Sequence, residues 1–287
     1  MTASSSGTGF WSCIDAIVVI NLDRRADRWA DIQAHLLALA PAEKIHRLSA
    51  VLGVNLPGYD SPKWFRRTPR AGTWAGRAGC TLSHRNALRL AQTRGWKRIL
   101  ILEDDARLSL ELNGPVGDML AAQLTMSNGR IGVCYLGYTS PRGPSRPRQS
   151  LHGPHVLYEL LGASTTHAYI VDSSLYQPLL DQLPQTDEAV WAWVARHTAI
   201  DRWYSLALAR ITTVTAVSPQ LAVQAPSHSD ITARQSAYEE AGTGEDLAPL
   251  RPTVLPYALA HFLSALQDRI GAIPRGLKCQ IRRLRGF

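Results

Sequence analysis

The chain has 287 residues, a formal net charge of +8 and a pI near 9.6. Hydrophobic residues make up 45% and charged residues 19%, which excludes a disordered chain and predicts a globular protein with a sizeable core. The 4 cysteines are scattered without a CxxC pair, which excludes a disulfide framework and favours a reducing compartment. Because we find no signal peptide and no apolar run of the ~20 residues that span a bilayer, we expect a cytoplasmic protein.

The positive charge is concentrated near the end of the sequence. Residues 275–287 contain five Arg or Lys residues and no acid. Spaced apolar residues in this segment fit a peripheral anchor at the anionic inner face of a membrane, and a solvated terminus is the alternative. Aromatic residues do not alternate with these cations, so we expect no nucleic-acid partner. A nucleic-acid-binding protein would reveal itself by a steep salt dependence of binding.

The first expected strand, residues 14–22, runs into a polar turn that contains three arginines. An amphipathic helix follows, with Asp23 as the candidate N-cap. The turn lies where a nucleotide binds in a βαβ unit, and the forked donors of Arg24, Arg25 and Arg28 suit a diphosphate. The alternative is that these arginines are solvated residues of the first helical turn.

Residues 45–51 predict a short second strand, and the aromatic-rich loop over 53–75 reads as functional rather than disordered. Beyond it, Gly79 is expected to relieve a tight approach at the start of a helix that continues to about residue 96, with Thr81 or Ser83 as its cap. Taken alone, His84 is more readily a structural histidine of the first turn than a catalyst. Cys80 alone is more readily a small buried residue than a nucleophile.

The next expected strand, residues 99–103, ends in three consecutive acids, Glu103, Asp104 and Asp105. Ligands of open α/β sheets bind beyond the carboxyl ends of strands, and three adjacent carboxylates repel one another unless a cation lies among them. Oxygen ligands suit Mg²⁺ or Mn²⁺. The alternative is a strand followed by a solvated acidic turn.

The remaining sequence predicts a mixture of helices and strands, which completes an α/β protein. In chain order we expect a helix with loops over 107–130, a strand over 131–137, a mobile surface loop over 139–155, a small-residue turn and strand over 162–172, helices over 173–183, 187–197 and from residue 200, a strand over 211–217, a linker over 236–256, an amphipathic helix over 255–270 and a basic tail.

Three stretches resemble, in the right order, motifs of glycosyltransferase family 25. They are Val19-Ile20-Asn21-Leu22-Asp23-Arg24-Arg25-Ala26-Asp27-Arg28, Gly79-Cys80-Thr81-Leu82-Ser83-His84 and Ile101-Leu102-Glu103-Asp104-Asp105-Ala106. Ala199-Ile200-Asp201 and Ser229-Asp230-Ile231 are similar to later motifs, so the resemblance covers roughly residues 14–235. It implies a GT-A-like, Rossmann-like α/β fold. It also implies transfer of a sugar, commonly galactose, from a UDP-sugar to a cell-surface glycan such as lipooligosaccharide, with inversion.

The resemblance also implies the members of the site. Glu103 and Asp105 become ligands of Mn²⁺ or Mg²⁺, with Asp104 beside the donor and His228 as an additional candidate ligand. The other candidates for the donor pocket are Asn21, Arg24, Arg25, Arg28, Gly79, Ser83 and His84. Inversion needs a carboxylate that takes the proton of the acceptor hydroxyl. Asp201 is the candidate base, helix capping is its alternative role, and Glu188 is the second candidate.

We therefore expect a flexible N-terminus over residues 1–13, a GT-A-like catalytic domain over 14–235, and a linker with a basic amphipathic helical tail over 236–287. The expected partners are a UDP-sugar donor, an oligosaccharide or lipid-linked acceptor and an anionic membrane surface. A second hypothesis keeps the same fold but makes the protein a catalytically silent binder of sugar nucleotides or glycans. Loss of turnover in Asp105→Asn would distinguish the enzyme from the binder.

Overall fold

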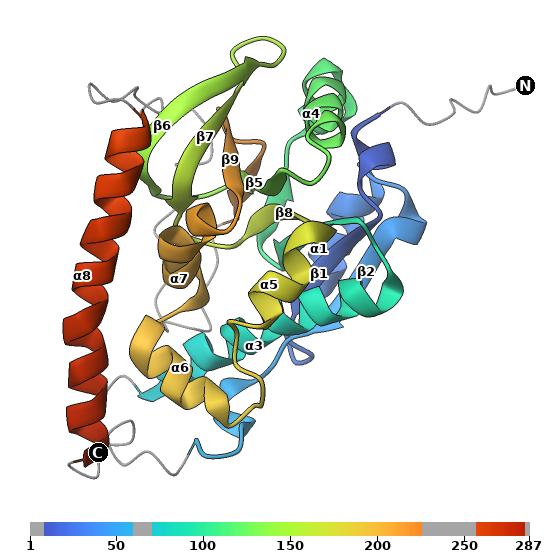
Figure 1. Ribbon diagram of the computed structural model, residues 1–287. Coiled ribbons are helices and arrows are strands. Elements are labelled where there is room, and N and C mark those ends of the chain that lie inside the picture. The colour runs from blue at the N-terminus through green and yellow to red at the C-terminus, as the bar shows by residue number, and fades with distance from the viewer. Residues whose placement is uncertain (1–8, 60–70, 226–256, 285–287) are drawn as a thin grey trace, which may run out of the picture.

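The computed structural model describes residues 9–59, 71–225 and 257–284 (Figure 1). Its centre is an eight-stranded sheet in the order β2-β1-β3-β8-β5-β9-β7-β6. These strands are β1 (Ala16–Asn21), β2 (Ile45–Ser49), β3 (Arg98–Glu103), β5 (Ile131–Gly137), β6 (Pro141–Ser150), β7 (Val156–Ala163), β8 (Ala168–Asp172) and β9 (Thr213–Ser218). A second sheet pairs β4 (Ala106–Leu108) with β10 (Ala222–Gln224).

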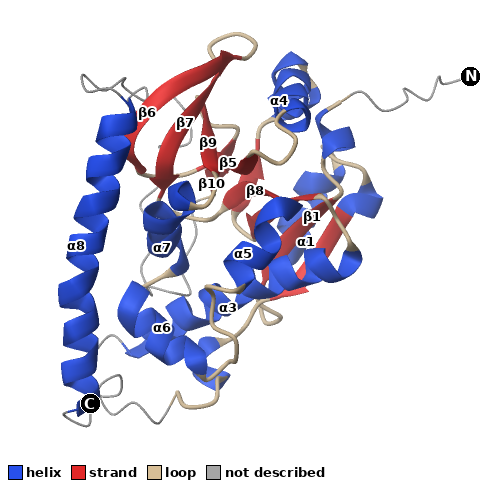
Figure 2. Cartoon of the chain, in the orientation of Figure 1, coloured by secondary structure: helices blue, strands red, loops and turns tan. Residues whose placement is uncertain are grey.

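Helices pack on both faces of the large sheet, as Figure 2 shows. They are α1 (Ala26–Leu37), α3 (Ala71–Arg94), α4 (Pro115–Met126), α5 (Tyr176–Leu180), α6 (Ala189–His197), α7 (Ile200–Ala207) and α8 (Tyr257–Leu284). The expected mixed α/β architecture is therefore confirmed over the described residues.

The sheet is mixed, and its parallel part positions the acidic motif. β1 pairs in parallel with both β2 and β3, while β8 runs antiparallel to β3 and β5. Ile20 lies opposite Glu103 in the register of β1 and β3. The polar turns that follow these two strands therefore start side by side, at the edge of the sheet where ligands of α/β proteins bind.

Two apolar cores lie on opposite faces of the sheet because successive strand residues point to opposite sides. On β3, Ile99 and Ile101 pack in the core that contains side chains of α3, α5, α6 and α7. Leu100 and Leu102 pack in the other core, with side chains of α1 and α4. Burial on both faces explains why β3 reads as one uninterrupted aliphatic run.

The structure corrects the expected start of the second helix. α3 begins at Ala71, so Thr81 and Ser83 lie within the helix, where their hydroxyls donate to the carbonyls of Arg77 and Gly79 at 2.8 and 2.7 Å. Neither residue is an N-cap, and His84 is not in a first turn. Small residues at the beginning of this helix conceal its periodicity, which is why the sequence places its start too late.

Three other expectations are also corrected. α1 begins at Ala26, and Asp23 accepts hydrogen bonds from Arg47 and Ser49 instead of capping the helix. The expected mobile loop over 139–155 contains β6, a strand at the end of the sheet order, and an edge strand tolerates proline because one side needs no N–H donors. The expected 107–130 helical region begins with a strand, β4.

The last helix is longer than expected. α8 runs from Tyr257 to Leu284, so the end expected at residue 270 is wrong. The expected linker over 236–256 lies outside the described residues, and so does His228. Within the described parts of the chain, no helix combines the length and apolar character that a membrane crossing requires.

Gly79→Ala is expected to lower the free energy of unfolding by about 1–3 kcal/mol, because overpacking of a close contact costs this much. A Cβ atom at position 79 would lie 2.2 Å from the carbonyl oxygen of Val51. Gly72→Ala, on the same helix, is the matched control, since a Cβ there meets no atom within 4 Å. Urea unfolding should show this variant unchanged or up to about 1 kcal/mol more stable. Equal stability of the two variants would contradict the close packing of α3 on residue 51.

Candidate functional site

The three acids of the motif do not share one environment. Glu103 ends β3 and contacts the α3 side of the sheet, whereas Asp104 contacts α1 on the other side. This separation continues the alternation of β3, in which odd-numbered residues face one core and even-numbered residues the other. Asp105 follows in the turn between β3 and β4. Consecutive carboxylates are thus divided between two faces and the edge of the sheet.

Asp104 connects the ends of β1 and β3 to α1. Its Oδ2 accepts a hydrogen bond of 2.8 Å from Asn21 Nδ2, and its Oδ1 accepts one of 2.9 Å from Arg28. Arg47 Nε donates to Asn21 Oδ1 at 2.9 Å, which orients the amide. Asp104 and Asn21 are buried, so this polar cluster compensates the charge of Asp104 inside the protein.

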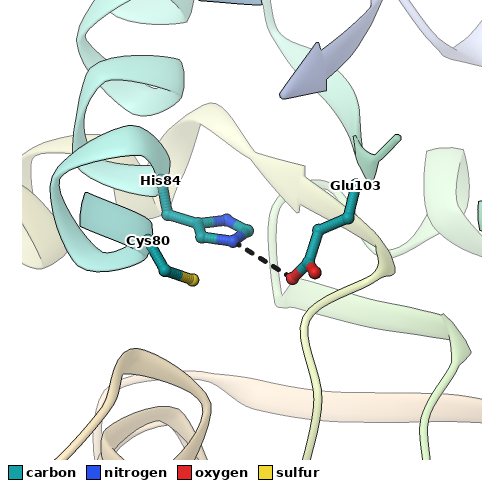
Figure 3. A group of neighbouring side chains, drawn as sticks. All are labelled: Cys80, His84 and Glu103. Carbon is teal, nitrogen blue, oxygen red and sulfur yellow. Dashed lines mark ion pairs between the residues drawn. The ribbon is translucent and has the colours of Figure 1, made fainter. Parts of the chain in front are cut away.

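Glu103 lies in a second cluster, on the α3 face (Figure 3). Its Oε1 accepts a hydrogen bond of 2.8 Å from Thr166 Oγ1 and lies 3.5 Å from His84 Nε2. The Nδ1 atom of His84 lies 2.8 Å from the hydroxyl of Tyr169. His84 is fully buried, so the ring connects the carboxylate at the edge of the sheet to a tyrosine in the core.

Asp105 is held at the start of the smaller sheet. Its backbone oxygen accepts a hydrogen bond of 2.7 Å from the backbone N–H of Ala225. Its carboxylate lies 3.4 and 3.5 Å from Gln224 Nε2 and 4.0 Å from the guanidinium of Arg28. Arg28 is thus close to both Asp104 and Asp105. The side chain of Asp105 retains 15% exposure, so a ligand at this edge can reach it.

The two outer carboxylates have opposite pKa shifts. Burial, followed by the charges of Glu103 and Asp104, raises the pKa of Asp105 to about 6. Burial would also raise the pKa of Glu103, but the neighbouring His84, 3.5 Å away, together with the hydrogen bond from Thr166 and the charge of His167, lowers it below its ordinary value. Glu103 is therefore held as a carboxylate, and the repulsion within the motif is concentrated on Asp105.

One group of side chains in the described residues has the composition and proximity of a metal site. Ligand atoms of Cys80, His84 and Glu103 all lie within 4.8 Å of one another. Burial raises the pKa of the Cys80 thiol well above its ordinary value, with smaller contributions from Glu103 and Asp201. A thiol that keeps its proton is a poor metal ligand. This group therefore differs from the oxygen-rich site expected from the sequence, and Asp105 is not part of it.

The chemistry of the acidic turn nevertheless suits a hard divalent cation. The pKa of Asp105 is raised partly by Glu103 and Asp104, and a cation beside Asp105 would relieve that repulsion. Carboxylate oxygens are the ligands that Mg²⁺ and Mn²⁺ prefer. Asp105 is the partly exposed carboxylate beside which such an ion would lie, and Glu103 is the other ligand that the sequence predicts.

Several candidates for the donor pocket contact other parts of the chain. Ser83 is buried, and its hydroxyl accepts a hydrogen bond of 2.8 Å from the backbone N–H of Val51. Gly79 provides the space for the same approach of residue 51. Arg25 forms an ion pair of 2.9 Å with Asp27, and Arg24 is exposed. The first βα turn thus presents guanidinium groups near the acidic motif, while Gly79 and Ser83 fix the packing of α3.

The two candidate bases lie in different environments. Asp201 is in the first turn of α7, and its Oδ2 is 3.4 Å from the backbone N–H of Thr165. The N-cap of α7 is Ala199, so the capping role considered for Asp201 is wrong. Glu188 is exposed and precedes α6. Asp201 contacts Thr165, whose neighbour Thr166 donates a hydrogen bond to Glu103, so Asp201 is connected to the Glu103 cluster through this short segment.

Three residues of this site were not among the sequence candidates. Thr166 binds Glu103, Tyr169 binds His84, and Gln224 lies beside Asp105. Thr166 belongs to the small polar run over 162–167, at the end of a predicted turn, and this position was the available indication. Tyr169 and Gln224 reach the site through antiparallel pairing of β8 with β3 and of β10 with β4, which no local pattern specifies.

Comparison with known proteins adds a family to this geometry. The model described as glycosyltransferase family 25 (LPS biosynthesis protein) matches residues 14–134. The matched segment, less than half of the chain, is similar to this family. The expected resemblance is confirmed over residues 14–134, which contain the first three motifs together with Asn21, His84 and the acidic turn. The later stretches at 199–201 and 229–231 lie outside the match. This similarity supports a glycosyltransferase role.

The other comparisons add little. No curated protein matches the chain. Among solved structures, the crystal structure of mannose-1-phosphate geranyltransferase from Thermus thermophilus is similar over 70% of this chain and 72% of that chain, with 13% sequence identity and a TM-score of 0.33. A TM-score this low supports no argument about fold or function.

Asp105→Asn is expected to stabilise the metal-free protein at about pH 8 by up to about 3 kcal/mol, and to leave its stability unchanged below about pH 4. The pKa of Asp105 rises from an ordinary value of 3.8 to about 6 on folding. The stability that the neutral Asp105 carboxyl contributes is therefore fully present below its pKa in the unfolded chain. It is lost as the pH rises through its pKa in the folded protein. Urea unfolding in EDTA across this pH range measures the effect.

Asp104→Asn is the control for this experiment, because Asp104 has an ion-pair partner in Arg28. Removal of its charge should destabilise the protein by about 2 kcal/mol at about pH 8, the usual cost of losing a hydrogen bond to a charged group. A loss of stability in Asp105→Asn at that pH would contradict the electrostatic account of the turn.

Proposed function

We propose that this chain is a metal-dependent, inverting glycosyltransferase of GT-A-like fold that moves a sugar from a UDP-sugar to a cell-surface glycan such as lipooligosaccharide. The observation that carries the proposal is the match of residues 14–134 to glycosyltransferase family 25, an LPS biosynthesis family. The position of the acidic motif beyond the parallel strands β1 and β3 supports it, because nucleotides bind at this edge of α/β sheets. Galactose is the first donor sugar to test, since the family resemblance favours it.

In this proposal Glu103 and Asp105 hold Mn²⁺ or Mg²⁺, and the first βα turn binds the donor diphosphate. A cation held there would supply stabilisation of the negative charge on the UDP leaving group. Arg28 lies 4.0 Å from Asp105, so its guanidinium can serve both the acidic motif and a phosphate oxygen. Asn21 and Asp104 support this arrangement by fixing Arg28 and the end of β1.

Asp201 is the proposed general base, which removes the proton of the acceptor hydroxyl as that oxygen attacks the sugar. Two observations favour it over Glu188. Asp201 contacts Thr165, next to the residue that binds Glu103, and its position in the first turn of α7 leaves it partly exposed. Glu188 precedes α6 as an exposed surface residue, without a contact to the acidic motif among the described interactions.

The alternative is a catalytically silent sugar-nucleotide or glycan-binding protein on the same fold. It shares the donor site, so binding of UDP with Mn²⁺ does not distinguish the two functions. Turnover does. Many transferases pass their sugar slowly to water and others wait for their acceptor, whereas a binder releases no UDP from any donor, with or without an acceptor.

The first experiment is therefore hydrolysis of a panel of UDP-sugars by the full chain, with Mn²⁺ and with EDTA. We expect metal-dependent UDP release from one donor and loss of that release in Asp105→Asn. Calorimetry of UDP with Mn²⁺ should show donor binding in the original chain. If the chain neither releases UDP nor binds it, the donor site at Glu103 and Asp105 is contradicted. If the chain binds UDP but releases none from any donor, with or without glycan acceptors, the silent binder is favoured.

Asp201→Asn is expected to lower kcat by about 10²–10⁴-fold, the usual contribution of a general base, while the affinity for UDP with Mn²⁺ stays unchanged. Glu188→Gln is the matched control and should retain full turnover. The reverse result, with Glu188→Gln inactive and Asp201→Asn active, would transfer the role of base to Glu188.

A further inference from the structure

The most prominent unexplained surface of the structure is an apolar stripe on α8. Fourteen large apolar side chains are exposed in the described residues, and eight of them lie on this one helix. Their exposure ranges from 39% to 70%. The members of this α8 stripe are Leu259, Phe262, Leu263, Leu266, Ile270, Ile273, Leu277 and Ile281. Single exposed apolar residues are ordinary, but a continuous set of this kind marks an interaction surface.

The eight side chains share one face of the helix. Their spacing of three and four residues places them within an arc of about 100° at 3.6 residues per turn, and the stripe is about 33 Å long. An amphipathic helix on a globular protein normally turns such a face toward the core. On α8 this apolar face points away from the other described residues. No described part of the chain therefore buries it.

The rest of the fold holds α8 by other residues. The helix lies along one side of the molecule, next to β6 and α6, as both ribbon views show (Figure 1). At its beginning, the guanidinium of Arg146 from β6 stacks 4.6 Å from the centre of the Tyr257 ring. α8 is thus attached to the sheet while its apolar stripe is presented outward.

The charge of α8 and of the residues that follow it indicates which partner the apolar stripe would contact. Residues 275–287 contain five Arg or Lys and no acid, and Asp268 is the single acid of the whole helix. An apolar stripe combined with a strongly basic composition is typical of helices that lie in the plane of an anionic lipid surface. Each cation near such a surface adds electrostatic attraction, and the stripe adds burial in the boundary of headgroups and acyl chains.

The same charge disfavours a second copy of this chain as the occupant. A parallel pair of α8 helices would place their two basic ends together, and an antiparallel pair would offer only Asp268 to the cations. Pro274 also lies inside the helix. Proline interrupts the regular hydrogen bonding and packing that a paired helix requires, whereas a lipid surface adapts to a bend.

We propose that α8 is an interfacial membrane anchor, whose stripe from Leu259 to Ile281 inserts in the plane of an anionic bilayer. The proposal does not depend on the transferase activity. The helix lies on the surface without crossing it, in agreement with its composition. A protein held in this way would act on molecules at the membrane surface.

Co-sedimentation of the full chain with vesicles tests this proposal. Vesicles of phosphatidylglycerol and phosphatidylcholine in equal amounts should bind the protein at least about 10-fold more tightly than phosphatidylcholine alone, because the cations contribute to binding. High salt should weaken the binding without abolishing it, since insertion of the stripe is not screened. Equal binding to both kinds of vesicle would overturn the preference for anionic lipid. Absence of binding to either would overturn the proposal that α8 is a membrane anchor.

Two double variants localise the contact. Ile270→Glu with Ile273→Glu places two charges in the stripe, and binding should fall by about 10-fold or more. Leu110→Glu with Met126→Glu is the matched control, because these residues are also highly exposed but lie away from α8. Control and original chain should bind alike. All three proteins should melt at the same temperature, since every substituted side chain is exposed.

Sedimentation velocity without lipid completes the test. The proposal expects the original chain and both variants to have the same oligomeric state at all concentrations. A concentration-dependent dimer that the stripe variant abolishes would assign the stripe to a second copy of this chain and overturn the proposal. Equal loss of vesicle binding in the stripe variant and the control would also overturn it, because the effect would then come from added negative charge alone.

Discussion

The organisation of the site depends on the alternation of side chains at the end of β3. Because neighbouring residues of a strand point to opposite faces, Glu103 meets His84 and Thr166 on the α3 side while Asp104 meets Asn21 and Arg28 on the α1 side. Each carboxylate acquires its own partners, so two acids that are adjacent in the chain do not have to share one cation. The parallel register of β1 and β3 then aligns both clusters along one edge of the sheet.

This division makes Asp105 the electrostatically distinct acid of the motif. It lies in the turn beyond the strand, where burial and the two preceding carboxylates raise its pKa to about 6. Glu103 has the opposite shift because of His84 and its neighbours. A cation bound beside Asp105 would relieve this repulsion, which agrees with the proposed metal dependence. Asp104, in contrast, holds the framework together, and its role is to position Arg28 and the ends of the strands.

The helix α3 connects this edge to the core. Gly79 and Ser83 bring residue 51 against the helix, and the next residue, His84, connects Glu103 to Tyr169. One short stretch of sequence thus serves packing and electrostatics together, which is why its residues did not reveal their separate roles in isolation. α8 lies apart from this site. It packs against β6 and α6 and combines an exposed apolar stripe with a basic composition.

The sequence by itself determined the features that depend on local pattern. The strands at 16–21, 98–103 and 131–137, the α/β class, the family 25 motifs and the importance of the acidic turn all follow from hydrophobic runs and short motifs. It failed where local pattern is weak or misleading: the early start of α3, the proline-containing edge strand β6 and the end of α8. Only the tertiary structure decided which acid meets which partner, because those contacts join strands and helices distant in the chain. Tyr169 and Gln224 reach the motif through strand pairing, and Thr166 lies in the segment that leads into β8. Such pairing is selected by the packing of the whole sheet rather than by any one segment.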